Sequence, residues 1–189
     1  MAVAGSEVRV AGSGHVYLAP VGTAMPTDTA ALPADWVDLG YVTEDGVMFN
    51  FDRETEDLNS WQGDKVRVLT LREPKSIEFA LMQTNVDIMV AAMGGGEVTA
   101  DSGNTTFTYT PPAEGTNTPH ALVVEFDDGS LIYRYAFPKV QLDGGVEFTL
   151  TRSGAVTYPL NFGVLDPDAG DAPFTIITND PAMDPGAPA

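Results

Sequence analysis

The sequence has no cysteine and only two histidines among its 189 residues. The lack of cysteine excludes disulfides and thiolate metal sites. The two histidines, His15 and His120, are too few for most zinc sites, and each is expected at the surface or in a turn. Asp166–Asp171 has part of a calcium-loop pattern but lacks the ligands at its fifth and twelfth positions, which favours a turn. We therefore expect no metal and no cofactor.

Basic residues are also scarce, with 9 lysines and arginines against 27 acidic residues and a net charge of −18. Residues 1–75 carry a net charge of −6 and residues 76–189 carry −12. Ordinary binding to a phosphate backbone needs clustered lysine and arginine, so the composition argues against it. An acidic surface keeps proteins apart in solution, and it would also repel a polyanion that passes close by.

Long apolar runs are missing as well. No segment approaches the roughly 20 apolar residues that a membrane helix needs. The first ten residues, MAVAGSEVRV, lack the charged start and apolar middle of a signal peptide. These absences predict a protein made in the cytoplasm with no membrane segment. Its length and its 43% hydrophobic content suit one domain.

Catalytic motifs are absent too. Gly94–Gly96 follows a predicted helix instead of opening one, and no lysine–serine pair comes after it, so it is not a nucleotide loop. The chain contains neither a Gly-x-Ser-x-Gly elbow nor an HExxH motif. We predict that the protein is not an enzyme.

Regular patterns do occur from Lys65 to Gly96. In residues 66–72, Val66, Val68 and Thr70 point to one side and the residues between them to the other, which predicts a strand with one mostly buried face. Residues 76–82 alternate again and predict a second strand. Glu73 and Pro74 between them predict a turn, because proline restricts both its own φ and the residue before it. The pattern therefore predicts a hairpin that leads into a helix.

The predicted helix begins after Thr84 or Asn85, either of which can cap it, and ends at Gly94–Gly96. Its apolar stripe, at helical spacing, consists of Val86, Met89, Val90 and Met93. A short helix beside many strands has to bury such a stripe against a sheet.

Most of the remaining chain reads as strand. Further strands are predicted at residues 14–20, 36–42, 47–51, 105–110, 121–126, 131–137, 146–152, 155–164 and 174–178. Turns are predicted at residues 44–46 and 127–129, and loop at 98–104. Nine to eleven strands and one helix predict a mainly β fold, a β-sandwich or barrel with one flanking α-helix and long loops or arms. The expected core residues are Ile77, Phe79, Leu81, Met89, Phe148, Leu150, Tyr158 and Leu160.

We divide the chain into a flexible N-terminal arm at residues 1–13, a β-sandwich domain at 14–178 and a flexible C-terminal tail at 179–189. Within the domain, residues 44–65 form a long loop or hairpin that is polar and acidic but carries Leu58 and Trp61. A solvated hairpin tip would explain this composition. A protein–protein contact would also explain it, because aromatic anchors concentrate at the centres of interfaces.

Four segments carry a resemblance to a known family. They are GHVYLAPVGTAMP from Gly14, WVDLGYVTEDGV from Trp36, IEFALMQTNVDIMVAAMGG from Ile77 and VEFTLTRSGAVTYPLNF from Val146. With the polar, tryptophan-bearing tip, they make the sequence resemble the major tail tube proteins of long-tailed, non-contractile (siphovirus-type) bacteriophages. The resemblance extends from about Gly14 to Thr178 and rests on the order and character of segments, not on a catalytic motif.

The resemblance implies a structural virion protein. Proteins of that family form hexameric rings that stack into a tube, and genomic DNA passes through this tube without specific binding. A long loop contacts the neighbouring ring, which makes Leu58 and Trp61 the candidate inter-ring residues, mobile in the free subunit and ordered between rings. The implied partners are other copies of the chain, the tape measure protein, the tail terminator and the distal tail proteins. The implied location is the virion tail, after synthesis and assembly in the host bacterial cytoplasm.

Candidates for the wall of the tube are Glu78, Glu147, Thr149 and Thr151. Each alternates with expected core residues on a predicted strand, so each is expected to face away from the core. Acidic residues in the wall would keep DNA phosphates from sticking, whereas lysine and arginine would bind them. An outward glutamate on an ordinary surface fits the same pattern.

Two other classes remain open on the residues alone. Another virion β-protein, such as a capsid decoration or tail terminator protein, could share this size, acidity and strand content. A carbohydrate-binding β-sandwich module is the third possibility. The missing signal peptide counts against a secreted module, and the helix after the predicted hairpin favours the tail tube.

Overall fold

A computed structural model describes residues 7–103, 105–167 and 170–186. These residues form twelve strands, one α-helix and, near the C-terminus, a short 3-10 helix at Pro181–Met183. The mainly β class with one helix is therefore confirmed. The elements are β1 (Ser13–Pro20), β2 (Val37–Asp38), β3 (Val42–Phe51), β4 (Glu54–Asn59), β5 (Lys65–Arg72), β6 (Lys75–Leu81), α1 (Val86–Ala92), β7 (Glu97–Ala100), β8 (Phe107–Thr110), β9 (His120–Asp128), β10 (Leu131–Leu142), β11 (Tyr158–Val164) and β12 (Thr175–Thr178).

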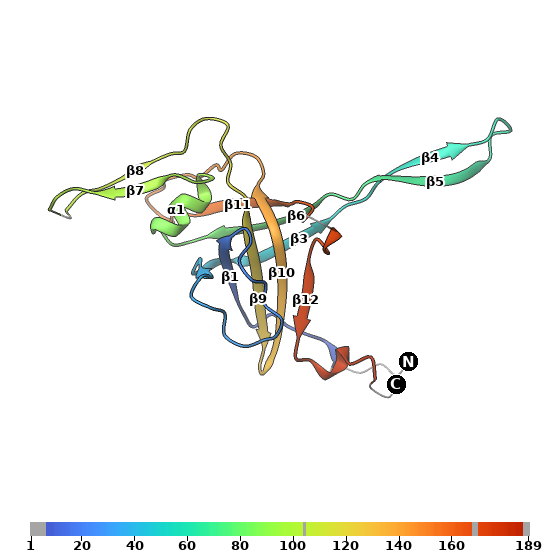
Figure 1. Cartoon of the computed structure of the whole chain (residues 1–189), viewed down its shortest axis with the longest axis horizontal. Helices are drawn as coiled ribbons and strands as arrows, with labels where there is room; N and C mark the ends of the chain where they lie inside the picture. The colour runs from blue at the N-terminus through green and yellow to red at the C-terminus, as the bar shows by residue number, and fades with distance from the viewer. Residues whose placement is uncertain (1–6, 104, 168–169, 187–189) are drawn as a thin grey trace.

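Eight of the strands form one antiparallel sheet in the order β2-β1-β9-β10-β11-β6-β3, with β12 paired to the long strand β10. In Figure 1, β1, β9 and β10 run steeply while β11, β6 and β3 run across the view. The sheet therefore bends, and its two halves enclose a common core. The predicted β9–β10 hairpin is confirmed, with Gly129 in the left-handed region (φ 68°) at its turn.

The core lies between the two halves of the sheet and α1. Five of the eight expected core residues, Ile77, Phe79, Leu81, Tyr158 and Leu160, are buried, and Met89 is partly buried. The other main contributors are Val16, Leu18, Leu39, Ile88, Leu122, Val124, Phe137, Val140 and Phe162. Alternation along β6 and β11 thus identified the buried face of these strands correctly.

The other two expected core residues were assigned wrongly. Residues 146–152 form no strand, and Leu150 is 73% exposed. Phe148 is also exposed and contacts the Tyr158 ring from one side, with ring centroids 5.2 Å apart. The physical reason is that β11 already pairs with β10 on one side and β6 on the other. The alternating segment therefore cannot form a hairpin with β11, the strand that follows it in the chain.

The predicted hairpin across Glu73 and Pro74 is also wrong. β5 pairs with β4, while β6 pairs with β3 and β11. The Asp52 amide donates to the Pro74 carbonyl at 3.0 Å, between the two pairs. β3–β4 and β5–β6 are thus the two sides of one long hairpin. Its near half lies in the main sheet, whereas its far half leaves the body, so that β5 is exposed on both faces instead of having a buried one.

Three shorter corrections concern neighbouring segments. The turn predicted at residues 44–46 is an irregularity inside β3, where the register with β6 shifts between Val42 and Val47. The strand predicted at residues 36–42 shrinks to the two residues of β2. The loop predicted at residues 98–104 contains part of β7, which pairs with β8.

The helix begins as predicted, with the Asn85 side chain accepting a hydrogen bond from the Ile88 amide at 2.9 Å. Its buried face consists of Ile88, Ala91 and Ala92, so the predicted stripe is displaced around the helix. Gly94–Gly96 end it with positive φ values. A Cβ on Gly96 would come within 2.5 Å of the Thr110 carbonyl, which requires glycine there. None of the described helices is long and apolar enough to cross a membrane.

A buried arginine fixes the loop that follows β1. Arg134 on β10 forms an ion pair with Glu125 at 2.5 Å and donates to the carbonyl oxygens of Asp28 and Ala30 at 2.6 and 3.0 Å. Trp36, at the end of this loop, is buried in a second apolar cluster with small residues of β1, β9 and β10. The loop between β1 and β2 is therefore held against the face of the sheet opposite the main core.

The two terminal segments meet at Asp180. Arg9 donates to its carboxylate at 2.6 Å, and Tyr133 of β10 also donates to it. The hydrogen bonds from Tyr133, the Ala182 amide and Arg9 hold the pKa of Asp180 below its usual range. Residues 1–6 of the predicted arm and 187–189 of the predicted tail lie outside the described residues, and the flexibility of both segments stays a prediction.

Candidate assembly surfaces

The far half of the long hairpin, β4–β5, projects from the body (Figure 1). In the described part of the chain its two strands pair only with each other. An isolated two-stranded hairpin is marginally stable in water, because it has no third layer in which to bury its side chains. This projection is therefore expected to gain stability from a partner.

Both faces of β4–β5 carry exposed apolar side chains. Cross-strand partners share a face, and Leu58 lies opposite Arg67, which places Leu58, Leu69 and Leu71 on one side. Val66 and Val68 lie on the other side and are 65% and 49% exposed. A surface of this kind, apolar on two faces and rimmed by charge, is typical of an interaction site.

Trp61 lies at the tip of β4–β5 and is fully exposed. The turn that presents it is closed by main-chain hydrogen bonds from Ser60 to Asp64 (2.8 Å) and from Gly63 to Ser60 (3.0 Å). An ion pair between Lys65 and Asp57 (2.7 Å) spans the strands just below the turn. The predicted inter-ring candidates Leu58 and Trp61 are thus both exposed at the far end of the projection.

The hairpin also concentrates the chain's few basic residues. Five of the nine lysines and arginines fall between residues 53 and 75. Besides the Lys65 pair, Arg72 contacts Glu54 at 2.8 Å and Arg53 contacts Glu73 at 2.7 Å. Arg67 forms no ion pair with any described residue. Exposed pairs of this type contribute only about 0–1 kcal/mol each, so these cations remain available to a partner at little energetic cost.

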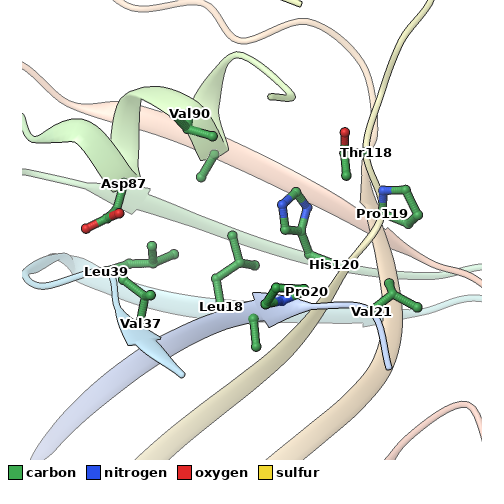
Figure 2. A pocket seen from close by; sticks show the side chains of 12 residues that line it. Leu18, Pro20, Val21, Val37, Leu39, Asp87, Val90, Thr118, Pro119 and His120 are labelled. Carbon is green, nitrogen blue, oxygen red and sulfur yellow. The ribbon is translucent and has the colours of Figure 1, made fainter. Parts of the chain in front are cut away.

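A groove of about 540 Å³ opens between β1, β2 and α1 (Figure 2). We call it the α1 groove and define it by Leu18, Val21, Val37, Leu39, Val90 and His120. Figure 2 shows the His120 ring projecting into the space below α1, with Asp87 on the helix at the margin. Burial lowers the pKa of His120. His120 is thus a partly buried strand residue and not a turn residue, whereas His15 is exposed on β1, as predicted.

The outer face of β3, β6 and β11 holds a hollow of about 410 Å³. Two lumen candidates, Glu78 and Glu147, line it together with Asp45. No lysine or arginine is among its lining residues in the described chain. Thr149 and Thr151 are exposed outside it, and the strand alternation used to select them and Glu147 does not exist there.

Within the described ranges of the chain, the sheet does not close into a complete barrel. β3 ends the strand order on one side, and β2 covers only Tyr17 and Leu18 of β1 on the other. A further groove of about 750 Å³ lies between the uncovered parts of β1 and β3, with the exposed Tyr41 on its wall. Uncovered strand edges have unpaired backbone groups that can pair with another chain.

Chemistry of a catalytic or metal site is not evident among the described residues. No group of three or more histidine, cysteine, aspartate or glutamate side chains there could hold a metal ion. The predicted turn at Asp166–Asp171 includes residues 168–169, which lie outside the described residues. The candidate sites are therefore surfaces. Sequence reasoning found the hairpin tip but missed the α1 groove, because its walls come from segments far apart in the chain.

The sequence matches a protein family described as "Phage tail tube protein" over residues 1–188. No curated protein matches it. Among solved structures, the tail of an empty gene transfer agent particle with C6 symmetry has 13% identity and a TM-score of 0.41, covering 88% of this chain and 96% of that one.

Two further structures are similar at the same level. The virion of a native gene transfer agent particle gives 12% identity and a TM-score of 0.42, over 79% of this chain and 92% of that one. The tube-terminating cap of the anti-feeding prophage has 10% identity and a TM-score of 0.48, covering 94% of this chain and 96% of that one. At these TM-scores the likenesses carry no argument about assembly.

Proposed function

The chain belongs to the phage tail tube protein family, and from this premise we propose that it forms six-membered rings that stack into the tail tube of a long-tailed, non-contractile phage. It is a structural tail tube protein, and we propose that its role is assembly and not catalysis. The siphovirus type and the number of subunits in each ring are part of the proposal.

The β4–β5 hairpin is the observation that carries the proposal. It presents Trp61 and Leu58 well away from the body, with no cover from its own chain in the described residues. A head-to-tail contact between two different surfaces of identical subunits does not close on itself, and it therefore propagates as a filament. We assign this hairpin to the contact between successive rings.

The sheet edges support contacts within a ring. The ten-residue strand β3 has a free edge, and part of β1 is uncovered on the other side of the sheet. Pairing of such edges around a closed ring would satisfy their backbone groups in every subunit. This arrangement would also leave no edge free for uncontrolled aggregation.

The lumen wall is assigned to the outer face of β3, β6 and β11. Glu78 and Glu147 share one hollow on this face, and its lining contains no cation in the described chain. Charges act on a passing duplex only within a Debye length, about 8 Å at physiological ionic strength. Acid at this face would let DNA pass without specific binding.

The partners and the location are part of the same proposal, and family membership supports them. The protein would reside in the virion tail after synthesis and assembly in the host cytoplasm. Its principal partner would be itself, with the tape measure protein inside the tube and the terminator and distal tail proteins at its ends. Of the alternative classes, a capsid decoration protein and a carbohydrate-binding module have no specific observation in their favour.

Electron microscopy of the purified full chain tests the proposal. We expect hollow tubes or six-fold rings by negative stain, at a concentration where a control protein of similar size stays dispersed. Dispersed monomers over a wide range of concentration and salt would contradict it. In assembled virions, replacing Glu78 and Glu147 by lysine should slow DNA ejection at low salt but not at high salt. Normal ejection at low salt would remove these two positions from the lumen assignment.

A further inference from the structure

We propose that the α1 groove receives the tip of the β4–β5 hairpin from a second copy of the chain, with Trp61 inserted into it. This inference rests on the proposed function, since it names the surface to which the ring-to-ring hairpin binds. Neither surface has a partner within the described residues of its own chain.

The two surfaces match in chemistry. The groove is lined mainly by aliphatic side chains, including Leu18, Val37 and Val90. Its volume of about 540 Å³ gives room for an indole ring. Tryptophan buries a large area with little loss of side-chain freedom, and it is among the residues most enriched at interface hot spots. An apolar groove and a fully exposed tryptophan on one chain therefore form a complementary pair.

Charge favours the same match. Arg67 lies cross-strand from Leu58, on the leucine-bearing face of the hairpin, and forms no ion pair within the described chain. Asp87 on the exposed side of α1 lines the groove and is likewise without an ion pair in the described residues. Arg67 and Asp87 carry opposite charges, so a pair between them across the contact would fix the orientation of the hairpin in the groove.

The occupant has to come from another copy. In Figure 1 the β4–β5 hairpin and α1 extend toward opposite sides of the body. The tip therefore cannot reach the groove of its own chain without unfolding the sheet between them. The hairpin tip and the α1 groove lie at different places on one subunit. A contact between them is therefore heterologous, and it repeats from copy to copy.

Cysteine cross-linking in the assembled full-length protein tests this contact, and the natural absence of cysteine gives it a clean background. Gln62→Cys places a thiol beside Trp61 and leaves the tryptophan in place, while Val21→Cys places one at the exposed rim of the groove. With a short bis-maleimide, tubes of this double variant should give a ladder of covalent oligomers. Gln62→Cys combined with Phe107→Cys, on the exposed β8 strand, is the matched control and should give none.

A charge exchange gives a second measurement that does not depend on cross-linking geometry. Arg67→Glu and Asp87→Lys should each slow tube growth roughly tenfold, and the double variant should regain most of the wild-type rate. Urea unfolding of each monomer verifies that the fold is intact.

The outcomes separate the two proposals. If the wild-type chain forms no rings or tubes, the proposed function fails. If it forms tubes, but only the Phe107 control cross-links or the charge exchange restores nothing, the tube assignment stands and the α1 groove is not the acceptor.

Discussion

Two hairpins extend from the body on opposite sides, and they differ in how they are held (Figure 1). β4–β5 follows β3 and β6 after a two-residue interruption on each side of the long hairpin, and its register is irregular at both ends. It carries exposed leucines and valines on both faces and a tryptophan at the tip. Its intrachain ion pairs lie at the surface, where each contributes only about 0–1 kcal/mol.

β7–β8 is shorter, rich in threonine and fastened at both ends. At its base the Tyr109 hydroxyl donates to the Gly95 carbonyl at 2.7 Å, which ties the hairpin to the end of α1. At its tip the Asp101 carboxylate accepts hydrogen bonds from the amides of Thr105 and Thr106 at 2.7 and 3.1 Å. Phe107 is its one strongly exposed large apolar side chain in the described residues.

The two hairpins differ in how much apolar surface they leave uncovered, and this difference separates a projection that is held within its own chain from one suited to binding a partner. β7–β8 forms hydrogen bonds at its turn and at its base within the chain, and it leaves little large apolar surface uncovered. β4–β5 leaves apolar side chains uncovered that could only be buried by another molecule. Uncovered apolar surface on a weakly held element favours an interaction site, whereas projection alone does not.

The largest expected effect separates the two halves of the long hairpin. Phe79 on β6 is buried and stacks on Phe162 with ring centroids 5.9 Å apart. Phe79→Ala should lower the free energy of unfolding by about 3–5 kcal/mol, the cost of the lost contacts plus a cavity. Leu71→Ala on the neighbouring β5, where the side chain is exposed, should change it by only about 0.5 kcal/mol. Urea unfolding of the monomer measures both, and equal losses would show that β5 is buried in the monomer as well.

The next effect concerns assembly. Leu58→Ser together with Trp61→Ser should leave monomer stability unchanged but prevent efficient tube formation. Losing one interface anchor costs about 2 kcal/mol or more, which is roughly a 30-fold loss of contact affinity. Phe107→Ser on β8 is the matched control and should polymerise normally. Sedimentation of polymer at fixed protein concentration gives the readout, and unchanged tube yield for the double variant would remove the hairpin from the ring contact.

A third effect is local. In the monomer, backbone amides of β4–β5 should exchange hydrogen quickly, because the hairpin opens without unfolding the body. In tubes their protection should rise roughly tenfold or more, while that of β7–β8 should change little. The sequence placed the mobile segment at residues 44–65, but the structure puts residues 44–51 in β3, so the response is expected in 54–72. Equal protection of β4–β5 before and after assembly would contradict its role as an ordering contact.

Local chemistry explains which elements could be predicted from the sequence. Asn85 caps α1 through a contact three residues away, and the turn at Asp127–Gly129 joins two strands that pair with each other. The buried face of β6 follows from alternation alone. Each of these features is caused by residues that lie close together in the chain, so a local sequence pattern is enough to predict it.

Pairing and burial at long range could not be predicted in this way. Alternation along β5 predicts a strand, but it does not predict which strand pairs with it. It also does not predict that both faces of β5 are exposed. The segment around Phe148 and Leu150 alternates equally well, yet the next strand, β11, is already paired on both sides. The α1 groove forms only when β1, β2 and α1 come together, and His120 lies far from all three in sequence.

The smallest expected effect is a difference in the pH response of the two hairpin tips. Hydrogen bonds from Thr106, Thr105 and the Thr105 hydroxyl hold the pKa of Asp101 below its usual range. A carboxylate with a lowered folded-state pKa stabilises the fold above its unfolded pKa, about 3.9, and this contribution is lost as the pH falls through the folded value. The β4–β5 turn is instead closed by main-chain bonds between Ser60, Gly63 and Asp64.

Acidification from pH 6 to pH 3 should therefore reduce the amide protection factors of Thr105 and Thr106, after correction for the intrinsic exchange rate. The protection of the Gly63 amide should change less, because its acceptor is a carbonyl oxygen that does not titrate. Asp101→Asn should give the lowered protection at both pH values, because an amide side chain accepts more weakly than a carboxylate. If protection of Thr105 and Thr106 in the unaltered protein stays constant down to pH 3, the Asp101 carboxylate is not what closes the β7–β8 turn, and the contrast between the two hairpins has to rest on their bases alone.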